Sequence, residues 1–207
     1  KYHDGEPVIR EALRRAMHII GTQFVMGETI EEAQSKAKGP EKKGYTLSYD
    51  ILGEGARSQA QADAYFESYL HALDVMGKDT KPEDSIHDMR GMSIKLSGLH
   101  PRYHLVKEAR LMDELLPRLK QLVRKAQEKH ITLSIDAEEA NRLDINLKVF
   151  TALFADPEFA DYDGPGYVLQ AYQKRALDVV DYLADLAESM GKKMPIRLVK
   201  GAYWDSE

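Results

Sequence analysis

The chain has 207 residues, of which 43% are hydrophobic and 30% charged, and its net charge at neutral pH is −5. This composition is typical of a globular protein with one large or two small domains, and the lack of a dense basic stretch argues against a nucleic-acid partner. Cysteine is absent, which excludes disulfides, thiolate metal sites and cysteine nucleophiles and fits a reducing compartment such as the cytoplasm.

The first 44 residues are predicted to form a helical arm or linker segment. Apolar residues recur at loosely helical spacing from residue 6 to residue 26, with Gly21 and Gly27 as breaks. Thr29 and Glu32 have the spacing of a capping box, so a second helix is predicted over residues 29–38. The sequence begins without Met and has neither a signal core nor about 18 consecutive apolar residues. We therefore expect a segment of a longer protein, with no membrane span.

From residue 45 onward, strand and helix patterns alternate along the chain. Strands are predicted within "TLSYDI", "GMSIKLSGL", "ITLSIDA", "YVLQAY" and "PIRLVKG". Helices are predicted over residues 58–76, 107–129, 143–155 and 175–190, and Pro117 within the second either marks its start or kinks it. This alternation predicts a parallel sheet with crossover helices.

Each predicted strand has one apolar face and one face that ends in a polar residue. An open doubly wound sheet is apolar on both faces and would need a large polar cleft to fit this pattern. A TIM-type (β/α)8 barrel fits better, because its inner face becomes polar near the carboxyl ends of the strands. About five of its eight strands lie in residues 45–207, so we expect an incomplete barrel. The side chains predicted to converge in its lumen are Asp50, Lys95, Asp136, Gln170 and Arg197.

Lys95, which is predicted to lie in the middle of its strand between two serines, is the most informative of these residues. On an edge strand it would be an ordinary exposed lysine, but its apolar neighbours favour a lumen position, where it must be paired or bind a ligand. Asp50 and Asp136 are its candidate partners, and its role would be to anchor a carboxylate or to act as a Schiff-base nucleophile. No metal site is predicted, because Glu138 and Glu139 lack a ligand motif and are interpreted as structural or solvated.

Several long motifs resemble a known family. The stretches "EPVIREALRRAMHIIGTQFVMGETIEEA", "SYDILGEGA", "SIKLSGLHPRY", "IDAEEANRL", "QAYQKR" and "RLVKGAYWDSE" are similar to the proline dehydrogenase domain of bifunctional proline utilization A flavoenzymes. The resemblance implies a distorted (β/α)8 barrel that holds FAD non-covalently. It further implies oxidation of L-proline to Δ1-pyrroline-5-carboxylate by hydride transfer from proline C5 to flavin N5, with the electrons passed to a quinone.

The resemblance also assigns expected roles to individual residues. Lys95 is expected to pair with the proline carboxylate, Arg197 to lie near flavin N5, and Glu54 to orient a substrate-binding arginine. The residues expected to be catalytic are Lys95, Asp136, Arg197 and Tyr203. Those expected to contact proline are Lys95, Asp136, Ala202 and Tyr203. Those expected to contact the flavin are Asp136, Ala137, Val168, Gln170, Tyr172, Arg197, Val199, Lys200, Gly201, Ala202, Tyr203 and Trp204.

The family pattern also extends beyond this sequence. Its paired carboxylate-binding arginines would follow Glu207, so an isolated 207-residue polypeptide is expected to bind FAD weakly or not at all and to lack turnover. The resemblance implies a cytoplasmic parent protein, with possible peripheral contact with the inner face of the membrane, possible oligomers, and NAD bound only by a second domain. The alternatives left open are a Schiff-base aldolase-type barrel that uses Lys95 and an inactive fragment.

Overall fold

The computed structural model describes residues 6–81 and 85–203, and the chain divides into two compact units, residues 1–45 and 46–207. The first unit contains helix α1 (Glu6–Phe24) and helix α2 (Ile30–Glu41). Thr29 caps α2 by accepting a hydrogen bond from the backbone N–H of Glu32, as the capping-box spacing predicted. The helix runs three residues beyond the predicted end at residue 38 and includes Pro40.

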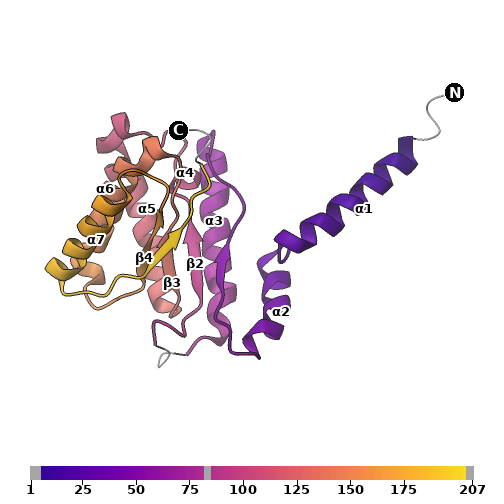
Figure 1. The fold of residues 1–207 in the computed structure, drawn as a ribbon, viewed down its shortest axis with the longest axis horizontal. Coiled ribbons are helices and arrows are strands. Elements are labelled where there is room, and N and C mark those ends of the chain that lie inside the picture. Colours follow the sequence, from indigo (N-terminus) through magenta and orange to yellow (C-terminus); the bar gives the residue numbers. More distant parts are fainter. Residues whose placement is uncertain (1–5, 82–84, 204–207) are drawn as a thin grey trace. The chain divides into compact units, whose positions relative to one another are not determined.

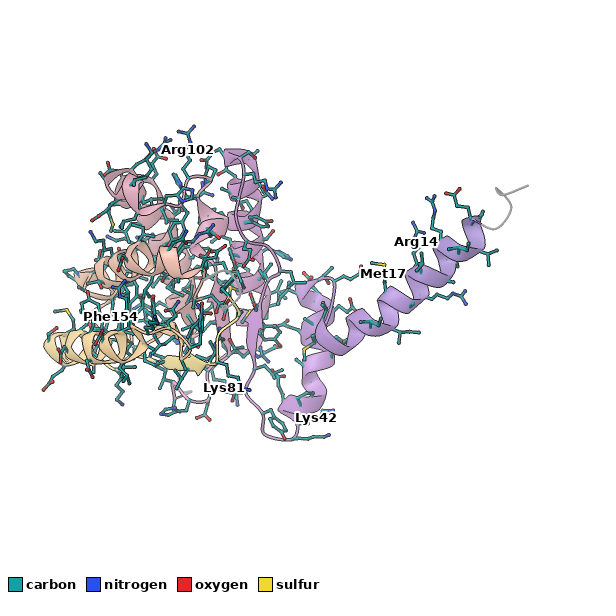
Figure 2. The ribbon with its side chains drawn as sticks, turned by 45° about the horizontal axis from the view of Figure 1, so that its top comes forward. Arg14, Met17, Lys42, Lys81, Arg102 and Phe154 are labelled. Atoms are coloured by element: carbon teal, nitrogen blue, oxygen red, sulfur yellow. The ribbon has the colours of Figure 1, made fainter. Side chains whose placement is uncertain are left out.

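Helix α1 leaves its apolar residues largely exposed. Val8, Leu13 and Met17 are 70%, 58% and 71% exposed, and Figure 2 shows Arg14 and Met17 projecting from the helix. In the described ranges 6–81 and 85–203, every helix is too short or too polar to cross a bilayer.

The second unit is a parallel half-barrel, which confirms the predicted fold class. Its strands pair in chain order, β1 (Ser48–Asp50), β2 (Gly91–Ile94), β3 (Thr132–Ile135), β4 (Pro165–Gln170) and β5 (Ile196–Val199). The longer helices that follow successive strands are α3 (Gln59–Met76), α5 (Glu108–Glu128), α6 (Leu143–Phe154) and α7 (Ala176–Met190). Figure 1 shows these helices flanking the strands. Shorter helical segments are η1 (Gly77–Asp79), α4 (Leu96–Leu99), η2 (Leu105–Lys107), η3 (Ala140–Arg142) and η4 (Pro157–Phe159).

Helix α5 supplies a large part of the core. Its leucine stripe, Leu111, Leu115, Leu119 and Leu122, is fully buried. Pro117 lies inside this helix, which begins nine residues earlier at Glu108 and continues to Glu128. The helix therefore does not start at the proline, because burial of the stripe outweighs the one backbone hydrogen bond that proline cannot make.

Face alternation is clearest in β1 and β3. In β3, Leu133 and Ile135 are buried while Thr132 and Ser134 are partly exposed, as predicted. Strands β2 and β4 are buried on both faces. In β5, Ile196 and Leu198 are 45% and 65% exposed, so the predicted cover of their apolar face is not present among the described residues.

One predicted strand is shorter than expected. The stretch "GMSIKLSGL" forms a strand only as far as Ile94, and Lys95 then precedes the helical turn α4. The N–H of Gly98 donates to the carbonyl of Lys95 at 3.0 Å, which closes this turn. The prediction that Lys95 lies in the middle of a strand is therefore wrong: it lies at the carboxyl end of β2, where barrel enzymes place functional side chains.

Candidate active site

The strand register brings four positions to one level near the carboxyl ends of the strands. Ile94 pairs with Ile135 and Ile135 with Tyr167, and each of these is followed by a residue that points to the opposite face. Val168 of β4 pairs with Arg197 of β5. The four residues at this level are Lys95, Asp136, Val168 and Arg197.

Charged side chains from four strands or strand ends meet in one network. Lys95 Nζ donates to Asp50 Oδ1 at 2.8 Å and to Asp136 Oδ2 at 2.9 Å. Arg197 Nη2 donates to the other oxygen of the same carboxylate, Asp136 Oδ1, at 2.5 Å and to Ser93 Oγ at 2.9 Å. Two cations thus share one central carboxylate, and four of the five predicted lumen residues lie together.

Burial differs across this network. The side chains of Lys95 and Asp136 are 13% and 11% exposed, whereas those of Asp50 and Arg197 are 47% and 41% exposed. Lys95 and Asp136 therefore form the inner part of the site. Asp50 and Arg197 are the members that solvent or a ligand can reach.

The charge of Lys95 is stabilised by its partners. Burial alone lowers the pKa of this amine, but hydrogen bonds and attraction from Asp50 and Asp136 outweigh burial and raise the pKa above its ordinary value. Lys95 is therefore a fixed ammonium at neutral pH. Its backbone N–H donates to the Tyr69 hydroxyl at 3.3 Å, which ties the end of β2 to α3; burial raises the pKa of Tyr69 to about 12.

Gln170 lies outside the ionic network and connects two loops instead. It is 2% exposed; its Nε2 donates to the carbonyl of Glu138 at 2.9 Å, and its Oε1 accepts from the backbone N–H of Ala202 at 2.9 Å. The amide therefore holds the loop after β3 and the segment after β5 at fixed positions. Both polar groups of the amide are used within the protein.

Glu138 is structural rather than solvated, which decides between the two readings of the sequence. It is 4% exposed, accepts from the Ser97 backbone N–H at 3.0 Å and pairs with Arg142 at 2.6 Å. Burial raises the pKa of this carboxyl despite these partners. Its neighbour Glu139 pairs with Arg142 at 3.1 Å and is more exposed.

The segment after β5 turns tightly over Tyr172. Gly201 has φ +126°, and a Cβ at this position would lie 2.0 Å from a ring carbon of Tyr172, so only glycine fits here. Tyr203 then donates its hydroxyl to Glu54 Oε2 at 3.0 Å; burial and the nearby Glu54 carboxylate raise the pKa of Tyr203. The bond joins the loop after β1 to the segment after β5.

The remaining predicted flavin contacts fall into three groups. Val168 is buried at the level of the ionic network, and Ala137 and Val199 are partly exposed. Lys200 and Ala202 are exposed beside Gly201. Trp204 lies outside the described residues.

Sequence reasoning assigned no site role to Ser93 or Tyr69. Ser93 lies two residues before Lys95, on the same face of the predicted strand, and a serine at such a position carries no further signal. Among residues 6–81 and 85–203, no group of three His, Asp or Glu side chains is placed to hold a metal ion.

Comparison with known proteins gives one consistent result. The proline dehydrogenase family profile matches residues 33–207. The chain is 50% identical to the bifunctional protein PutA of Escherichia coli over 203 residues, which is 98% of this chain but only 15% of that protein. It is 29% identical to the proline dehydrogenase of Deinococcus radiodurans, covering 95% of this chain and 57% of the relative.

Solved structures agree with these relationships. A crystal structure of proline utilization A from Bdellovibrio bacteriovorus, inactivated by N-propargylglycine, matches with a TM-score of 0.89 at 28% identity. The match covers 97% of this chain and 22% of that one. A proline utilization A mutant from Bradyrhizobium japonicum matches with a TM-score of 0.81 at 45% identity, covering 99% and 21%. Profile, sequence and structure all support one conclusion: this chain belongs to the proline dehydrogenase family.

Proposed function

We propose that the protein oxidises L-proline to Δ1-pyrroline-5-carboxylate with FAD as the hydride acceptor. The observation that carries the proposal is the network in which Lys95 and Arg197 share Asp136 at the carboxyl ends of the strands. It offers one fixed ammonium for a substrate carboxylate and one accessible guanidinium for an electron-rich cofactor. Family membership supports the same assignment.

The donor groups fit a flavin. Arg197 is 41% exposed at the mouth of the network, and among the described residues only its Nη2 is engaged in hydrogen bonds. Its Nε and Nη1 can donate to a flavin ring, and the fixed positive charge favours the anionic reduced state. FAD supplies the hydride-accepting chemistry when it is bound. Residues 199–203 and Gln170 are proposed to line its ring, because Gly201 lets this segment turn closely over Tyr172.

Lys95 is proposed to bind the carboxylate of proline. Its pKa is raised, so it carries a full charge at neutral pH, and Asp136 holds its Nζ in place. Asp50 is the more exposed of its two partners, so a substrate carboxylate can compete with Asp50 for the ammonium. This ion pair would orient the substrate, while the reaction needs no protein nucleophile. Tyr203 is proposed to border the substrate, and Glu54, bonded to Tyr203, to support it.

A Schiff-base aldolase is the competing hypothesis. Such an enzyme needs a neutral lysine amine, which proteins obtain by lowering the pKa through burial or a neighbouring cation. The two carboxylates around Lys95 raise its pKa instead. We therefore favour the proline dehydrogenase assignment, and trapping of a carbonyl substrate by borohydride would contradict it.

The wider context is proposed from the family. Electrons would pass from the reduced flavin to a quinone, which implies peripheral contact between a cytoplasmic protein and the inner face of the membrane. An oligomeric parent protein and an NAD-binding second domain are part of the same proposal. The chain spans 15% of the length of its Escherichia coli relative, so these properties belong to the whole protein.

The test uses the purified intact protein. We expect a yellow protein whose visible flavin absorbance is bleached by L-proline without oxygen. Lys95→Ala should raise KM for proline strongly while FAD stays bound. Lys125→Ala, which removes a surface partner of Asp74, is the matched control and should leave KM unchanged. A colourless protein, a flavin that proline does not reduce, or an unchanged KM in Lys95→Ala would overturn the corresponding part of the proposal.

A further inference from the structure

Ser93 is a buried residue in direct contact with the functional guanidinium. It lies in β2, is 1% exposed, and its Oγ accepts a hydrogen bond from Arg197 Nη2 at 2.9 Å. Strand β5, which carries Arg197, is separated from β2 by β3 and β4 in the sheet. The bond therefore crosses the lumen face of two strands.

Small residues leave space for the Arg197 side chain to reach Ser93. Ser93 pairs in register with Ser134, and Ser134 pairs with Gly166. This row lies one level below Lys95, Asp136 and Arg197, since side chains on one face repeat every two residues. A larger side chain in the row would occupy the space through which the guanidinium approaches Ser93.

The two acceptors of Arg197 differ in how firmly they are fixed. The Asp136 carboxylate also accepts a hydrogen bond from Lys95, so its position can shift when Lys95 binds a ligand. Ser93 projects from the interior of a strand that is buried on both faces. It gives Nη2 a second acceptor whose position does not depend on the occupancy of Lys95.

We propose that Ser93 is a positioning residue for the flavin reaction: together with Asp136 it fixes the orientation of the Arg197 guanidinium. The inference rests on the proposed function, because it assumes that Arg197 faces the flavin. With Ser93 in place, two acceptors hold Nη2, so the guanidinium presents its Nε and Nη1 donors in one orientation. Without Ser93 the guanidinium rotates about its single remaining acceptor and stabilises the reduced flavin less well.

The experiment compares Ser93→Ala with Ser134→Ala in the intact, FAD-loaded protein. Both changes remove one inward-facing hydroxyl from the same row, but only Ser93 bonds to Arg197. We expect Ser93→Ala to make the flavin reduction potential more negative. It should also slow flavin reduction by proline about three- to tenfold, the loss that corresponds to one typical intramolecular hydrogen bond. KM for proline should stay within about twofold because Lys95 is untouched. Ser134→Ala should match the wild type in reduction potential, in the rate of flavin reduction and in KM for proline.

A second measurement does not depend on turnover. In protein stripped of flavin, nitrogen NMR of the Arg197 side chain should show faster rotation of its guanidinium in Ser93→Ala than in wild type or Ser134→Ala. Wild-type potential, rate and side-chain dynamics in Ser93→Ala would overturn the inference, as would equal effects of the two variants. A wild-type flavin that proline fails to reduce would overturn the proposed function, while the potential and the NMR comparison would still decide whether Ser93 positions Arg197.

Discussion

Asp136 is the single acceptor that joins the two cations of the site. One of its oxygens binds Lys95 and the other binds Arg197, and its side chain is 11% exposed. A carboxylate used on both sides cannot move toward one partner without weakening its bond to the other. The two cations are thereby coupled through one carboxylate, which suits a site that must hold a substrate against a cofactor.

Asp136→Ala is expected to destabilise the protein, because it leaves Lys95 and Arg197 without their common acceptor. The loss should lie between the ~1 kcal/mol of an exposed pair and the ~3–5 kcal/mol of a buried one, since the site is partly open. Asp144→Ala is the control, because its pair with Arg175 is 44% and 56% exposed and should contribute about 0.5 kcal/mol. Urea unfolding measures both free energies of unfolding. Equal losses in the two variants would contradict a central role for Asp136.

The sequence identifies some of these residues better than others. Lys95, Asp136 and Arg197 are charged side chains at positions where alternation demands a lumen orientation, so their place on one shared face follows from the pattern alone. The bond from Arg197 to Ser93 does not, because it depends on how far a long side chain reaches across a row of small ones. Glu138 was left between two interpretations, since only the fold shows which backbone N–H groups surround it.

The leucine stripe of α5 shows how an element positions the site. Leu115→Ala in this fully buried stripe should lower the free energy of unfolding by about 2–5 kcal/mol, through lost apolar burial and the cavity left behind. Leu177→Ala in α7 is the matched control, because Leu177 is 79% exposed and its truncation should change the free energy by less than about 0.5 kcal/mol. Chemical denaturation of both variants tests the contrast. A small loss for Leu115→Ala would mean that α5 does not pack as described.

Long elements are predictable from periodicity and short ones are not. The predicted helix over residues 58–76 differs from α3 by one residue, because its capping serine and its closing glycine are both explicit in the sequence. The four-residue helix α4 has no periodic signal, so its residues were assigned to the strand before it. That error displaced Lys95 from the end of a strand to its middle, although the face on which it lies was predicted correctly.

At the scale of the whole molecule, parallel pairing is what turns separate strand ends into one site. All neighbouring strands run in the same direction, so the charged residues at the ends of β1, β2 and β3 meet Arg197 of β5 at one rim. The alternation of apolar and polar residues along the predicted strands predicted this rim. It could not predict the tilt and register that place Arg197 beside Asp136 and Ser93, because these depend on packing between the helices and the sheet.

The two compact units should differ strongly in local stability. Helix α1 has Val8, Leu13 and Met17 more than half exposed, and most of the stability of a helix in a protein comes from packing of its apolar face. Helix α5 buries a full leucine stripe. Hydrogen exchange on the 207-residue chain should therefore show α1 amides exchanging close to the rate of an unfolded peptide. The amides of α5 should be at least about a thousandfold slower, because they exchange only through opening of the core. Equal protection of the two helices would mean that α1 is packed in solution.

The control is the same measurement on a chain that starts at residue 46. Loss of α1 should leave the protection of the α5 amides unchanged.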